Sequence, residues 1–153
     1  MKAFRILVTF ISISSLVSYS SCKSGGGSSE TTQDKQLGLL SKTWKISTVT
    51  LESVDQTSKW PSFQLTMTGT KGATSFDYTC AGRPTFSPWP PTGKWAFGTD
   101  PVTQIIRDPS GTDIVPMTYT VTATTLQINF NYTGPGYARI SSVAGNWVFN
   151  FTN

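Results

Sequence analysis

The chain has 153 residues, which corresponds to one domain, and 13% of them are charged against about 25% in an ordinary soluble domain. It contains no histidine, so Ser-His-Asp and Cys-His catalysis and imidazole metal sites are excluded. The formal charge of +4 includes Lys2 and Arg5, and the other basic residues are scattered along the chain, which argues against a nucleic-acid partner.

The first 21 residues have the features of an export leader. Lys2 and Arg5 form a positive segment, and the apolar stretch over residues 6–17 is too short to span ~30 Å of hydrocarbon. Small residues then precede Cys22. This arrangement resembles the bacterial lipoprotein lipobox, in which the leader is cut before the cysteine and the sulfur is diacylated. We therefore expect a signal peptide over residues 1–21 and lipidation at Cys22; the alternative is an ordinary signal peptide with an incidental cysteine.

A Gly/Ser-rich run follows Cys22 and behaves as a flexible coil. Residues 22–36 are therefore expected to form a lipidated tether, with one domain over residues 37–153. The expected location is the cell envelope, as an outer membrane lipoprotein that faces the periplasm or the cell surface. The membrane is then a partner through the lipid at Cys22.

The domain begins with a helix-compatible stretch and continues as alternating strands. A helical turn is expected over residues 34–40, with Asp34 as its N-cap. Apolar and polar residues alternate afterwards, which predicts strands with one buried face. The clearest apolar sets are Val115, Met117, Tyr119 and Val121; Leu126, Ile128, Phe130 and Tyr132; and Trp147, Phe149 and Phe151.

Short turn sequences connect these strands, among them residues 69–72, 108–111 and 133–136. No helical pattern is long enough for a crossover, so neighbouring strands pair antiparallel. An apolar face that continues over this many strands is satisfied by curling the sheet into a barrel. The predicted fold class is all-β: an antiparallel up-and-down β-barrel of about eight to ten strands with a short N-terminal helical turn.

Three short motifs carry a resemblance to a known family. They are the opening strand at residues 39–46, the Gly-x-Trp-x-Phe sequence at 93–97, and the strand pair at 119–128. Over residues 37–153 the chain resembles the lipocalin-like domain lipoproteins of Bacteroides-type bacteria. The resemblance implies an up-and-down barrel and no particular substrate, because a fold does not fix a function.

Aromatic residues in the irregular segments are the candidate ligand-binding residues. Trp60 follows the first strand, and Phe86 and Trp89 lie in a stretch that four prolines keep out of regular pairing. These three rings are expected to form a rim or lid over a barrel mouth, stacking on a sugar or an apolar ligand. The alternative is that Trp60 and Trp89 fold back and plug the barrel ends. Tyr119 and Arg139 complete the predicted site, with Arg139 pointing inward or lining a polar outer face.

No catalytic residue, cofactor or metal site is predicted. The acids next to prolines, Asp100 and Asp108, are typical turn formers, and Asp77 is expected to face water because it lies between two aromatic residues. Cys80 has no histidine to activate it. It is expected to be a buried or half-buried thiol, and the alternative is a nucleophile near Arg83.

These features favour a non-enzymatic, membrane-anchored lipoprotein that binds a small apolar or amphipathic ligand inside the barrel. One alternative is a barrel filled by its own side chains, acting as a structural or protein-interaction subunit of an envelope complex. A further alternative is glycan binding through exposed Trp60 and Trp89. The interior volume distinguishes the ligand-binding barrel from the filled barrel, since an eight-stranded barrel is just wide enough to be filled by side chains or to hold one small ligand.

Overall fold

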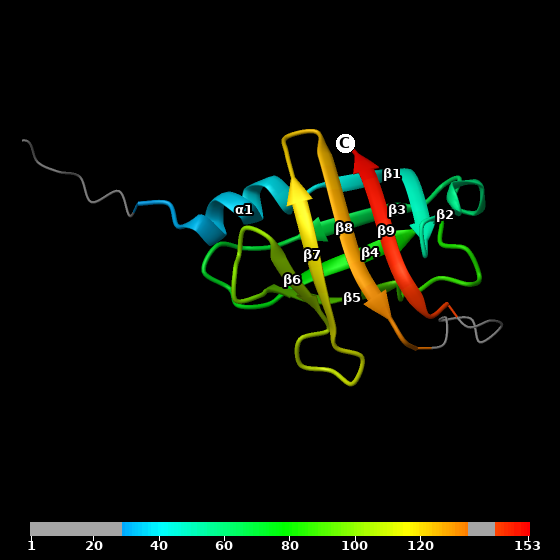
Figure 1. The fold of residues 1–153 in the computed structure, drawn as a ribbon. Helices are drawn as coiled ribbons and strands as arrows, with labels where there is room; N and C mark the ends of the chain where they lie inside the picture. Colours follow the sequence, from blue (N-terminus) through cyan, green and yellow to red (C-terminus); the bar gives the residue numbers. More distant parts are fainter. Residues whose placement is uncertain (1–28, 135–142) are drawn as a thin grey trace, which may run out of the picture.

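The computed structural model describes residues 29–134 and 143–153, which form one helix followed by an almost entirely β fold (Figure 1). The predicted leader, Cys22 and Arg139 lie outside the described residues. Within the described ranges, no helix is long and apolar enough to cross a membrane. The elements in chain order are α1 (Thr32–Leu40), β1 (Thr43–Leu51), β2 (Val54–Asp55), the 3-10 helix η1 (Thr57–Lys59), β3 (Gln64–Thr68), β4 (Phe76–Ala81), β5 (Thr92–Phe97), β6 (Gln104–Arg107), β7 (Val115–Val121), β8 (Thr125–Tyr132) and β9 (Gly145–Thr152).

The strands form a closed antiparallel meander. Their order in the sheet is β2-β1-β3-β4-β5-β6-β7-β8-β9, and β1 also pairs with β9. Because β2 is a two-residue strand attached only to the end of β1 in the described sheet, the closed barrel has eight strands. The predicted antiparallel up-and-down barrel is confirmed.

Closure depends on the length and bend of β1. Its first residues pair with β3, from Thr43↔Thr66 to Lys45↔Gln64, and its remainder pairs with β9 as far as Leu51↔Trp147. The register with β9 shifts between Ile46 and Thr48, as expected for a bulge that bends a strand. In Figure 1, β7, β8 and β9 accordingly cross β3 and β4 at a steep angle, which gives a flattened barrel.

The core follows the predicted alternation and is rich in aromatic rings. In β8, Leu126 and Ile128 are buried whereas Gln127 is exposed. Asp77 in β4 faces solvent, as predicted, and pairs with Lys94 at 2.6 Å on the outer face. The aromatic residues of the core are Trp44, Trp60, Phe63, Phe76, Tyr78, Trp89, Trp95, Tyr119, Phe130, Tyr132, Trp147, Phe149 and Phe151.

Helix α1 covers one end of the barrel. It begins earlier than expected: Thr31 is the N-cap, and Asp34 is the third helical residue of a reciprocal capping box. The prediction of Asp34 as N-cap is therefore wrong, and residues 32–36, assigned to the tether, are helical. Leu37 and Leu40 are buried against the barrel, and the Trp44 indole donates to the Leu40 carbonyl at 2.9 Å.

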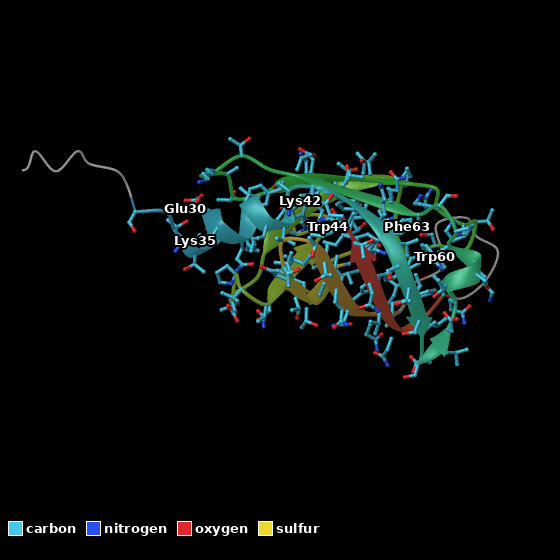
Figure 2. All side chains as sticks on the ribbon, turned by 90° about the horizontal axis from the view of Figure 1, so that it is seen from above. Glu30, Lys35, Lys42, Trp44, Trp60 and Phe63 are labelled. Carbon is cyan, nitrogen blue, oxygen red and sulfur yellow. The ribbon has the colours of Figure 1, made fainter. Side chains whose placement is uncertain are left out.

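The opposite end of the barrel is closed by connecting segments. These include residues 52–63 between β1 and β3, 82–91 between β4 and β5, and 108–114 between β6 and β7. Figure 2 shows Trp44 close to α1, with Trp60 and Phe63 toward this opposite end. Both barrel ends are therefore covered by the chain itself.

Candidate functional site

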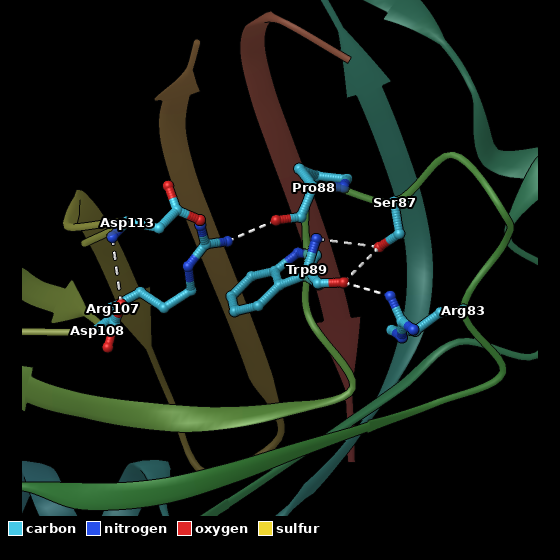
Figure 3. Close-up of polar contacts among 7 residues, drawn as sticks. All are labelled: Arg83, Ser87, Pro88, Trp89, Arg107, Asp108 and Asp113. Atoms are coloured by element: carbon cyan, nitrogen blue, oxygen red, sulfur yellow. Dashed lines mark hydrogen bonds and ion pairs between the residues drawn. The ribbon is translucent and has the colours of Figure 1, made fainter. Parts of the chain in front are cut away.

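The segment of residues 82–91 turns inward from β4 and carries Trp89 into the barrel (Figure 3). It begins at Gly82, where φ is 63° and an added Cβ would lie 2.1 Å from the Ser62 carbonyl oxygen. Only glycine accommodates this conformation and this close approach. The Ser87 hydroxyl accepts from the Trp89 backbone N–H at 3.0 Å, so a local hydrogen bond fixes the turn before the ring enters the core.

The Trp89 ring packs at the centre of the barrel, where it is 2% exposed. It meets Tyr78, Phe130 and Phe149 edge-to-face, with ring centroids 5.5 to 5.9 Å apart. These are favourable aromatic geometries. For Trp89, the structure therefore shows the plug and not the rim.

Arg107 holds the plug in place from β6. Its side chain is 1% exposed, and its guanidinium donates to the Pro88 carbonyl at 2.6 Å and to an Asp113 carboxylate oxygen at 2.8 Å (Figure 3). The guanidinium carbon also lies 5.8 Å from the Trp89 ring centroid and 5.4 Å from that of Tyr132. One buried cation thus joins residues 82–91, which we call the plug segment, to β6, β8 and the β6–β7 connection.

The barrel interior is filled. Among the described residues, an internal cavity of about 10 Å³ lies between Tyr78, Trp89, Arg107 and their neighbours. The Tyr78 hydroxyl and the Trp89 indole N–H are buried without a hydrogen-bond partner among the described residues. This volume matches roughly one water molecule, so a ligand of several non-hydrogen atoms enters only if core side chains move.

The predicted ligand-binding residues do not form one rim. Trp60 is fully buried, with its ring 5.0 Å from that of Phe149, and Phe86 is half-buried, 6.0 Å from Trp60. Tyr119 lies at the α1 end, where its hydroxyl contacts Gln36 and the Pro101 carbonyl. Because Trp60 and Trp89 are both buried, the alternative of glycan binding through exposed tryptophans is wrong.

A larger opening lies on the outer wall, between β7 and β8. The ladder joining these strands runs from Val121↔Leu126 to Thr118↔Asn129 and stops there. At the turn, the Thr122 N–H donates to the Thr125 carbonyl. In an antiparallel ladder, hydrogen-bonded pairs recur every second residue. After the pair of Thr118 and Asn129, the next hydrogen-bonded pair would therefore be residues 116 and 131. Residue 116 is Pro116, which has no N–H to donate.

Beyond this point the two strands separate. β7 continues along β6 to Val115, and β8 continues along β9 to Tyr132, but neither continues along the other. A groove of about 580 Å³ lies over this seam on the outer face of the barrel. We call it the β7–β8 groove; its lining residues are Gly98, Thr99, Gln104, Ile105, Ile106, Pro116, Met117, Thr118, Asn129, Phe130, Asn131, Asn146, Trp147 and Val148.

Sequence reasoning missed this groove, although Pro116 was a usable signal. A proline inside an otherwise alternating strand marks an interrupted ladder. The register that places Pro116 opposite residue 131 depends on the β7–β8 turn, and this fixes where the wall opens.

Cys80 is a half-buried free thiol, as predicted, and is not activated. Burial raises its pKa from 9.0 to about 12, and the nearby cations Arg83 and Arg107 offset this only in part. The thiol is therefore protonated near neutral pH. This argues against the alternative role of Cys80 as a nucleophile.

The free energy of unfolding is expected to fall as the pH rises above about 9. Burial raises the pKa of both Cys80 and Tyr78, so both groups lose their protons earlier in the unfolded chain than in the barrel. The contribution of buried Cys80 to the free energy of unfolding has its full value below the pKa of the unfolded chain, 9.0, and it is lost as the pH rises toward 12. The free energy of unfolding then falls by about 1.4 kcal/mol per pH unit for each group that is ionised in the unfolded chain and still protonated in the barrel.

Urea unfolding at pH 8, 9, 10 and 11 measures this loss. Cys80→Ala should remove the part of the decline that begins near pH 9 and retain the part due to Tyr78 and Tyr119, since burial raises the pKa of both tyrosines. An unfolding free energy that is constant from pH 8 to pH 11 would contradict the burial of these groups.

Fold and interior together define the class of the molecule: a closed eight-stranded antiparallel meander barrel whose core is occupied by its own side chains. Comparison with protein-family models, curated proteins and solved structures found no match.

Proposed function

We propose that this chain is a lipid-anchored, non-enzymatic envelope lipoprotein whose filled barrel acts as a binding subunit through its outer surface. One observation carries this proposal: the interior cavity measures about 10 Å³, whereas the β7–β8 groove measures about 580 Å³. A barrel used as a container needs free volume inside, and this one has its free volume outside.

The membrane anchor in this proposal rests on the sequence. The apolar leader ends where Cys22 begins, and the Gly/Ser-rich run separates Cys22 from the first helix. Membership of the lipocalin-like domain lipoproteins is part of the same proposal. It is supported by the three motifs and by the meander topology that the resemblance implies.

Binding of a small apolar or amphipathic ligand inside the barrel is the second candidate. The unpartnered Tyr78 hydroxyl and Trp89 indole N–H favour it, because both border the internal cavity. It requires Trp89 to leave the core. The hydrogen bond from the Arg107 guanidinium to the Pro88 carbonyl, next to Trp89, opposes that movement.

One experiment tests the anchor and the filled interior together. The full chain is produced in a Gram-negative host with radiolabelled palmitate, beside Cys22→Ser as the matched control. We expect the label and membrane sedimentation in the first protein only. Native mass spectrometry of the first protein, released from detergent micelles, should give the mass of the acylated chain alone.

Two results would count against the proposal. Label in the Cys22→Ser protein, or none in either, would overturn the anchor. An excess mass that disappears on denaturation would show a loaded interior and favour the second candidate.

A further inference from the structure

We propose that the β7–β8 groove binds a neutral oligosaccharide of hexose or pentose units. This inference rests on the proposed function, since it names the ligand class of the outer surface. The site does not use Trp60 or Trp89. Outward-facing side chains of β6, β7, β8 and β9 supply its polar groups, and core residues such as Trp147 and Phe130 also line it.

The polar groups of the groove form a continuous row across the strands. Gln104 lies opposite Thr118, Thr118 opposite Asn129, and Asn129 opposite Val148. Neighbouring positions in such a row are about 4.8 Å apart. The row therefore presents two amides and a hydroxyl at regular spacing along one surface.

Amides and hydroxyls suit sugar hydroxyl groups because both partners donate and accept hydrogen bonds. Part of this capacity is already used: the Asn131 amide donates to Asn146 at 3.1 Å, and the Asn129 amide donates weakly to Gln127 at 3.4 Å. The Thr118 hydroxyl has no hydrogen bond within the described part of the chain, and the side-chain amide oxygen of Gln104 accepts only a long one, 3.3 Å, from the Asp100 backbone N–H. These groups remain available to a ligand.

The charge of the groove selects a neutral ligand. Its lining contains no acidic or basic side chain among the described residues. A phosphate or carboxylate ligand would be bound without the cation that normally pairs with it. Phosphorylated and acidic glycans are therefore disfavoured.

The apolar part of the groove distinguishes a sugar from other neutral ligands. Ile106, Pro116 and Val148 offer small apolar surfaces between the amides, which suit the C–H faces of sugar rings. A lipid chain would cover the amides and leave them unpaired. An extended peptide added at the seam would need a ladder of backbone donors, and Pro116 removes one of them.

The test uses amide-resolved NMR titration of the chain with soluble hexasaccharides of glucose, mannose or xylose, one at a time. We expect at least one of them to shift the side-chain amide resonances of Gln104 and Asn129. Thr118→Val and Asn129→Ala should each weaken that binding at least tenfold. Thr79→Val is the matched control on the outer face of β4 and should leave binding unchanged.

The outcomes separate this inference from the proposed function. If none of the three sugars shifts the groove resonances, or if the groove variants bind as well as the unmodified chain, the oligosaccharide inference is overturned. Groove shifts with a neutral Ser/Thr/Val hexapeptide in place of sugar would overturn the ligand class and leave the surface-binding proposal standing. A loaded interior in native mass spectrometry would overturn the proposed function itself.

Discussion

Replacing Trp89 with alanine is expected to lower the free energy of unfolding by about 3–5 kcal/mol, the usual cost of removing a large buried aromatic side chain. Trp89 is 2% exposed and meets four aromatic rings in the middle of the barrel. Its loss would leave a large apolar cavity next to the guanidinium of Arg107. Urea unfolding followed by tryptophan fluorescence measures the change.

The matched control is Phe86→Ala, in the same segment. Phe86 is half-buried, so its truncation should cost roughly 1 kcal/mol. Indole should raise the unfolding temperature of Trp89→Ala and leave the unmodified chain unaffected, because it has the shape of the ring that the truncation removes. A cost for Trp89→Ala no greater than for Phe86→Ala would show that the ring does not fill the core.

Asp113→Ala is expected to destabilise the barrel by about 2–3 kcal/mol. It removes the carboxylate that lies 2.8 Å from the guanidinium of Arg107, a side chain only 1% exposed. Removing one partner of a fully buried pair costs about 3–5 kcal/mol, and the lower figure applies because Asp113 itself is 39% exposed. Chemical denaturation of the purified variants gives the value.

A double-mutant cycle isolates this interaction. In an Arg107→Leu background, Asp113→Ala should cost less than about 0.5 kcal/mol, since no buried cation is left behind. Asp77→Ala is the surface control: it breaks the exposed ion pair with Lys94, which contributes about 0–1 kcal/mol. Equal costs of Asp113→Ala in both backgrounds would contradict a specific role for the pair.

The strands were predictable because burial on one face has a period that the sequence displays. Leu126, Ile128 and Phe130 alternate with polar residues. Because short turns force neighbouring strands to pair antiparallel, a meander barrel could be predicted from this pattern. The helix start was missed by three residues. Thr31 and Asp34 are both acceptable caps, and only the reciprocal hydrogen bonds identify Thr31 as the N-cap.

The position of the plug could not be predicted in the same way. Residues 82–91 have no periodicity, and their four prolines exclude ladders without specifying a direction. Whether Trp89 points outward or inward depends on the fit to a cavity built by strands far away in sequence, and on the cation at Arg107. The burial of Trp89 is therefore determined by tertiary contacts and not by the local sequence.

The β7–β8 groove was less predictable than the strands and more predictable than the position of Trp89. Pro116 is visible in the sequence, but its effect needs the register that sets it opposite residue 131. Gln104, Thr118 and Asn129 come from three strands and become neighbours only when the sheet forms.

The pairing of β1 with β9 has a consequence for the order of folding. The pairs run from Lys45↔Thr152 to Leu51↔Trp147, so the barrel closes through contacts between residues about a hundred positions apart. Such long-range pairing slows folding, because the chain loses loop entropy before it gains the contacts. Until β9 has been synthesised, β1 and β8 keep open edges, and a chain truncated before β9 is expected to aggregate through them.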